Sequence, residues 1–73
     1  MRTSKVREII IPYKEDVQIN PSVTLNDKII YAIEVMLNNN VKDIAVVQNK
    51  RAIGMVRLED AFKKIGLQIP RDK

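Results

Sequence analysis

The sequence contains no cysteine and no histidine among its 73 residues. The lack of cysteine excludes a disulfide framework, a thiolate zinc site and a cysteine nucleophile, so we expect an intracellular, cytoplasmic protein. The lack of histidine removes the commonest general base and transition-metal ligand. The carboxylates form no recognisable acid/base pair or metal constellation, and we therefore expect a protein that is not an enzyme.

Long apolar runs are also missing. None approaches the roughly 20 residues that span a bilayer, so we expect no membrane span. The stretch MRTSKVREII lacks the apolar core and small-residue cleavage site of a secretory signal. A chain of this length is expected to form one small domain over residues 1–73, with its core at about 6–66 and a tail at 67–73.

The charge and the aromatic content of the chain indicate which kinds of partner it can bind. Thirteen Lys and Arg against nine Asp and Glu give a net charge of +4, which favours anionic partners. The basic residues are not strongly clustered, and aromatics make up only 4% of the chain. Proteins that bind single-stranded nucleic acid usually present exposed aromatics for base stacking. We therefore interpret most of the charges as solvated surface and do not expect a nucleic-acid binder.

The clearest pattern in the chain is a strand, a turn, a strand and a helix. Residues 44–47 and 52–56 are apolar runs that predict an antiparallel hairpin, with Asn49 in the turn at positive φ. From Leu58 the apolar spacing becomes helical, and Gly66 is a plausible C-terminal stop. The apolar stripe of this predicted helix consists of Leu58, Ala61, Phe62 and Ile65.

The longest predicted helix runs from Thr24 to Asn39, with Asp27 as the partner of Thr24 in a capping-box variant. One apolar face is formed by Leu25, Ile29, Ala32, Ile33 and Met36. Ile30 and Leu37 on one flank and Val35 on the other widen the apolar arc to about twice the roughly 100° of one packed face. Either the sheet curls around this helix, or its flanks contact another copy or another domain.

The remaining segments complete the predicted topology. Ser4 is expected to cap a short helical turn over residues 6–10, and residues 17–19 alternate as a short strand. A helix connects this strand to the strand at 44–47, as expected for parallel neighbours. The predicted fold class is α/β (α+β): a small three-stranded mixed sheet with two main helices on one face, in the order β-α-β-β-α after a short helical turn.

Four segments in this order resemble a cystathionine-β-synthase (CBS) domain. They are VREIIIP (6–12), VQINPSVTL (17–25), IAVV (44–47) and GMVRLED (54–60). The resemblance implies a single motif, half of a Bateman-type pair, that acts as a regulatory module and not as a catalyst. It implies a homodimer through the 24–39 and 58–65 helices, with a cleft for AMP, ATP or S-adenosylmethionine, and an attached or partner effector domain.

The GMVRLED segment carries the implied phosphate and ribose contacts. A helix that starts after Val56 leaves free N–H groups that favour an anion. The resemblance implies that Asp60 binds the ribose hydroxyls, although an acid there equally compensates the helix dipole. Arg57 replaces a usual Thr or Ser and either holds phosphate or fills the cleft. Glu59 would repel phosphate unless Arg57 neutralises it.

The implied adenine slot involves Ile11, Val17, Val41 and Asp43. Ile11 replaces a common Thr and keeps an apolar wall, while Asp43 either accepts from an adenine amino group or discourages the ligand. Lys42 adds a phosphate contact or is a surface lysine. The alternative function is a dimerisation module of the same fold in which Arg57 and Glu59 close the cleft and no nucleotide binds.

Overall fold

The centre of the fold is the hairpin that the apolar runs predict. In the computed structural model, which describes residues 4–66, β2 (Asp43–Gln48) and β3 (Arg51–Arg57) pair antiparallel. The turn residues Asn49 and Lys50 have φ values of 53° and 66°, as a type I′ turn requires. The prediction of a positive φ at Asn49 is therefore confirmed.

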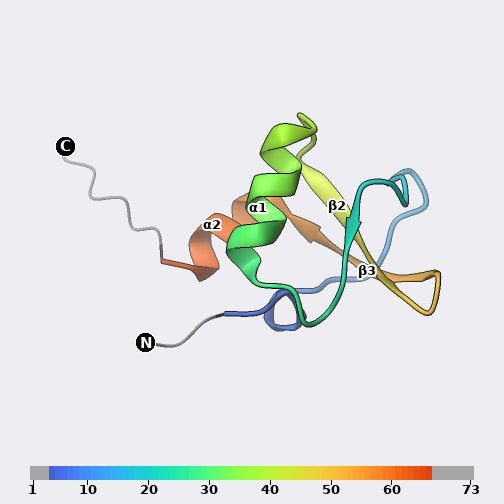
Figure 1. The fold of residues 1–73 in the computed structure, drawn as a ribbon, viewed down its shortest axis with the longest axis horizontal. Coiled ribbons are helices and arrows are strands. Elements are labelled where there is room, and N and C mark those ends of the chain that lie inside the picture. Colours follow the sequence, from blue (N-terminus) through green and yellow to red (C-terminus); the bar gives the residue numbers. More distant parts are fainter. Residues whose placement is uncertain (1–3, 67–73) are drawn as a thin grey trace.

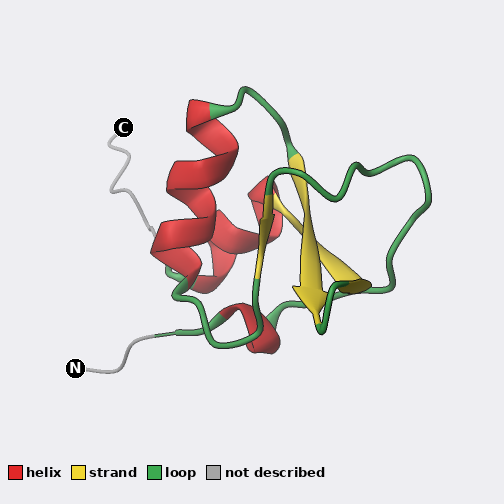
Figure 2. Ribbon diagram, turned by 45° about the vertical axis from the view of Figure 1, so that its right-hand side comes forward, coloured by secondary structure: helices red, strands yellow, loops and turns green. Residues whose placement is uncertain are grey.

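The sheet has three strands in the order β1-β2-β3, with β1 (Ser22–Val23) parallel to β2. Helices α1 (Ile29–Asn38) and α2 (Leu58–Lys64) lie together on one face of this sheet (Figures 1 and 2). The 3-10 helix η1 (Val6–Glu8) precedes β1. This architecture confirms the predicted fold class, a small mixed sheet with two main helices on one face.

The first strand lies further along the chain than the alternation at residues 17–19 predicts. The N–H of Val17 donates to the carbonyl of Lys14 at 3.0 Å and so closes a turn. Val17 is buried, whereas Ile19 is 45% exposed. The strand forms instead at Ser22–Val23, where Val23 is 2% exposed and pairs with Val46. The strand prediction for 17–19 was wrong because three alternating residues do not distinguish a strand from a turn.

Helix α1 begins at Ile29 and not at Thr24. The first turn of the predicted helix does not form, because the carbonyls of Leu25 and Asp27 accept hydrogen bonds from the N-terminal segment. Leu25 accepts from the N–H of Arg7, and Asp27 accepts from the N–H of Val6. The Ile29 N–H donates to the carbonyl of Ser4 at 3.0 Å. The predicted capping pair forms only a local turn, in which the Thr24 N–H donates to Asp27 Oδ2 at 2.8 Å.

The start of η1 also differs from its prediction. Its N-cap is Lys5 and not Ser4, and the Lys5 N–H donates to Glu8 Oε2 at 3.1 Å. The C-terminal helix agrees more closely with its predicted start and end. Helix α2 ends at Lys64, and Gly66 follows with a φ of 66°. The predicted tail at 67–73 lies outside the described residues.

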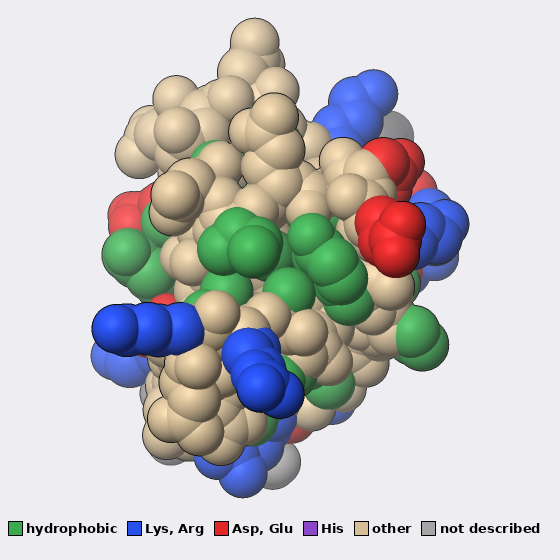
Figure 3. Space-filling model, turned by 90° about the vertical axis from the view of Figure 1, so that its right-hand side faces the viewer, with side chains coloured by type: hydrophobic (Ala, Val, Ile, Leu, Met, Phe, Trp, Pro, Cys, Tyr) green, Lys and Arg blue, Asp and Glu red, His purple; other side chains and the backbone are tan. Residues whose placement is uncertain are grey.

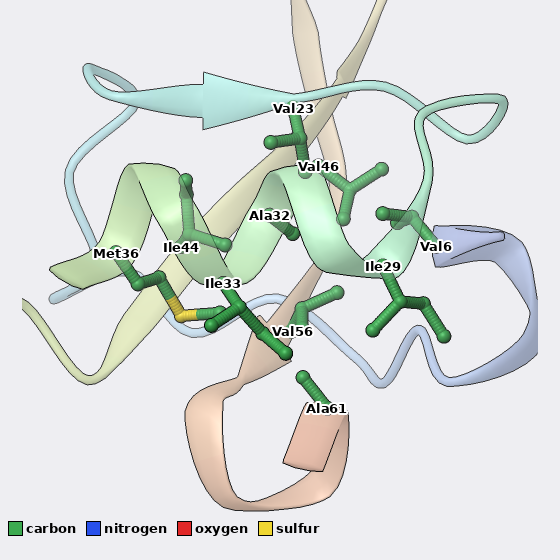
Figure 4. Packing of buried hydrophobic residues seen from close by; sticks show 10 residues of the cluster. All are labelled: Val6, Val23, Ile29, Ala32, Ile33, Met36, Ile44, Val46, Val56 and Ala61. Carbon is green, nitrogen blue, oxygen red and sulfur yellow. The ribbon is translucent and has the colours of Figure 1, made fainter. Parts of the chain in front are cut away.

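The main hydrophobic core fills the space between the helices and the sheet. The predicted face of α1 supplies Ile29, Ala32, Ile33 and Met36, all of which are buried. They meet side chains from η1, the three strands and α2, as Figure 4 shows. These partners are Val6, Val23, Ile44, Val46, Val56 and Ala61. The helical period therefore identified the packed face of α1 correctly, although Leu25 joins the core from outside the helix.

A second, smaller cluster covers the other face of the sheet. Ala45 and Met55 alternate with the main-core residues of their strands and pack with Val17. Ile11 and Tyr13 extend the cluster, and the backbone of Ile11 exchanges two hydrogen bonds of 2.9 Å with Met55. Ile11 therefore lies beside β3 at the edge of the sheet, and Tyr13 and Val17, further along, pack on the sheet face opposite the helices.

Candidate functional site

The hairpin register and the start of α2 bring charged residues together at one end of the sheet. Asp43 opens β2 and pairs with Arg57, which closes β3. The N–H of Leu58, the first residue of α2, donates to the carbonyl of Lys42 at 2.8 Å. These links place Lys42 and Asp43 beside the Arg57-Leu58-Glu59 segment.

An open groove of about 570 Å³ lies at this junction, within the size range of small-molecule sites. Its apolar side chains come from β3 and α2 and its charged ones from four parts of the chain. The apolar residues are Met55, Leu58 and Phe62; the cations are Lys14, Lys42 and Arg57; and the carboxylates are Asp16, Asp43 and Glu59. We call this site the junction groove.

Three cations face three carboxylates in the junction groove. Arg57 Nη2 lies 2.7 Å from Glu59 Oε2, and their side chains are 47% and 60% exposed. An ion pair this exposed contributes little to stability and opens readily. Within residues 4–66, Lys14 and Lys42 take part in no ion pair. The guanidinium and both ammonium groups are therefore accessible to an anionic ligand.

The structure brings only some of the predicted site residues into the junction groove. Asp43, Arg57 and Glu59 line it together. Val17 and Val41 line an adjoining hollow, which shares Asp43 with the groove. Both valines also pack in the hydrophobic clusters. They therefore support the wall of the hollow and offer a ligand little exposed surface.

Ile11 and Asp60 lie elsewhere. They line a separate hollow beside η1, together with Lys63 and Lys64. The backbone N–H and carbonyl of Ile11 are both bonded to Met55. Within one chain, the implied ribose contact of Asp60 and the implied adenine contact of Asp43 therefore do not share a groove.

Lys14, Asp16 and Phe62 are among the groove residues that were not predicted as site residues. Lys14 and Asp16 belong to the irregular segment that precedes β1, whose path has no periodic signal. Phe62 was assigned to the packed stripe of its helix because its spacing from Leu58 fits that stripe. Figure 3 shows the face that includes the hairpin turn and this irregular segment, with hydrophobic side chains at its middle and charged ones around them.

Comparison with known proteins adds no assignment: no family model, no curated protein and no solved structure matches this chain. The resemblance to CBS domains therefore remains a prediction that depends on the residues of this sequence. Over residues 4–66, neither helix combines the length and the apolar content that crossing a membrane would need.

Proposed function

We propose that this chain is a regulatory module that pairs with a second copy and binds an adenosine-containing nucleotide, of the AMP, ATP or S-adenosylmethionine class, in the junction groove. The observation that carries the proposal is the groove itself. It collects Asp43, Arg57 and Glu59 from three elements, together with the apolar residues Met55, Leu58 and Phe62 and two further cations. An apolar surface with a few convergent charged groups is typical of a small-ligand site.

The groups of the groove match the parts of a nucleotide. Arg57 can bind a phosphate through two parallel N–H groups, and Lys14 and Lys42 add positive charge. The carboxylate of Asp43 can accept from an adenine amino group. The Arg57–Glu59 ion pair opens at little cost, because both side chains are largely in water.

Pairing is supported by the outer flank of α1. Ile30 and Leu37 are 53% and 57% exposed, so the sheet does not curl around the helix to cover them. Val35, on the other flank, is partly buried against the main core. We propose that a second copy covers Ile30 and Leu37, which agrees with the homodimer implied by the resemblance.

A thermal-shift and calorimetric titration with AMP, ATP and S-adenosylmethionine tests the nucleotide site. A ligand that binds only the folded chain raises its stability, by about 2.7 kcal/mol at a hundredfold excess over Kd. We expect Arg57→Ala to weaken phosphate-containing ligands about tenfold or more, and Arg51→Ala at the hairpin turn to have no effect. If none of the three ligands binds the wild-type chain, the nucleotide proposal is wrong.

The implied ribose role of Asp60 has its own test. Asp60 lies outside the junction groove of its own chain, so it can reach the ligand only from a second copy. We expect Asp60→Ala to weaken nucleotide binding. The free energy of unfolding, measured by urea denaturation, should stay within about 0.5 kcal/mol of wild type. Unchanged affinity would rule out the ribose contact.

The second candidate is a pairing module without a nucleotide. It is favoured by the 2.7 Å ion pair of Arg57 with Glu59 in the groove and by the equal numbers of cations and carboxylates there. A wild-type dimer that none of the three ligands stabilises would identify this function.

A further inference from the structure

Phe62 is the one residue of the predicted apolar stripe of α2 that does not pack in the hydrophobic core. Ala61 is fully buried, and Leu58 and Ile65 pack against the main core. Phe62 belongs to neither hydrophobic cluster and its side chain is 38% exposed. Over the described residues 4–66, more than a third of Phe62 stays exposed to solvent, so its ring presents apolar surface that this part of the chain does not cover.

The exposed ring lines the junction groove. It lies one helical turn after Leu58, which also lines the groove, and it is the only aromatic side chain among the groove residues. Three cations and three carboxylates share the groove with it, and Lys14 and Lys42 take part in no ion pair within residues 4–66. This combination of an aromatic face and neighbouring positive charge is complementary to a ligand that is both planar and anionic.

We propose that Phe62 is a binding residue for the base of the nucleotide, with the planar ring of the base stacked against the phenyl face. The inference rests on the proposed function, and it divides the groove into two parts. Phe62 and the neighbouring apolar surface take the base, and Arg57 with the two lysines takes the phosphate. Stacking is tolerant of base identity, so Phe62 confers affinity for a base and not a choice between bases.

The test separates the two halves of the ligand by calorimetry, with adenosine, ribose 5-phosphate and AMP as probes. Phe62→Leu keeps an apolar side chain of similar reach but removes the aromatic face. We expect it to weaken adenosine and AMP about 5- to 100-fold, as the loss of one stacked base does, and to leave ribose 5-phosphate unchanged. Arg57→Ala should weaken ribose 5-phosphate and AMP and leave adenosine unchanged, and Phe62→Tyr should bind all three probes like wild type.

The outcomes distinguish this inference from the function on which it rests. Absence of AMP binding by the wild-type chain contradicts the proposed function. Wild-type AMP binding with no loss in Phe62→Leu overturns the stacking role alone. Equal losses for adenosine and ribose 5-phosphate would also overturn it, since they would indicate a collapsed groove. A Phe62→Leu chain that has become monomeric would identify Phe62 as a pairing contact instead.

Discussion

Gly54 is the residue of β3 against which the neighbouring N-terminal segment packs most tightly. A Cβ atom there would lie 2.8 Å from the carbonyl oxygen of Ile11 and closer still to the side chain of Ile10. The close approach allows Ile11 to exchange its two hydrogen bonds with Met55. A glycine at this position is therefore required by backbone contact and not by a turn.

We expect Gly54→Ala to lower the free energy of unfolding by about 1–3 kcal/mol, the usual cost of forcing an atom into a packed site. Urea denaturation measures it. In an Ile10→Ala background the additional cost should be smaller but not zero, because the Ile11 carbonyl remains in the way. An unchanged urea midpoint in Gly54→Ala would mean that the segment can move off β3 freely.

The hairpin turn places a lysine in the left-handed conformation that glycine adopts most readily. Lys50 has a φ of 66°, a conformation that costs a side-chain-bearing residue about 1–2 kcal/mol relative to glycine. Lys50→Gly would create the Asn-Gly pair that type I′ turns prefer, so we expect stabilisation by about 1 kcal/mol. The matched control is Arg51→Gly, at the next residue and the first of β3. This change should lower the free energy of unfolding by about 0.5–1 kcal/mol. Equal effects of the two glycines on the thermal midpoint would contradict this account.

Elements set by local spacing could be predicted from the sequence, and those set by distant contacts could not. The hairpin, the buried face of α1 and the stop at Gly66 follow from apolar period and turn chemistry. The start of α1 does not, because the competing hydrogen bonds come from Ser4, Val6 and Arg7. The same division applies to the site.

Asp43 and Arg57 meet because the hairpin register pairs them, and Glu59 follows in the first turn of α2. The resemblance to CBS domains implied all three as site residues, and that role stays a prediction. Lys14 and Asp16 arrive on an irregular segment, which has no periodicity to reveal its path. Phe62 has the same apolar spacing as a core residue, so only its exposure distinguishes it from one.

At the scale of the whole molecule, the outer flank of α1 determines the association state that we propose. We expect Leu37→Glu and Ile30→Glu each to raise the dimer dissociation constant at least about tenfold, because a buried carboxylate at a pairing surface has no partner. Sedimentation velocity over a range of concentrations measures this. Ile53→Glu replaces a hydrophobic residue of the hairpin that is 41% exposed, and it should leave the dimer intact. A wild-type chain that stays monomeric throughout would refute the pairing.

The hydrogen bonds between Ile11 and Met55 also bear on how the chain is made. Synthesis proceeds from the N-terminus, so the segment around Ile11 leaves the ribosome long before β3 does. Until β3 emerges, Val6 and Arg7 can already bond to Asp27 and Leu25, but Ile11 lacks the strand that holds its backbone. The segment around Ile11 is therefore among the last parts of this domain to reach its place, and the sheet cannot be completed before β3 has been translated.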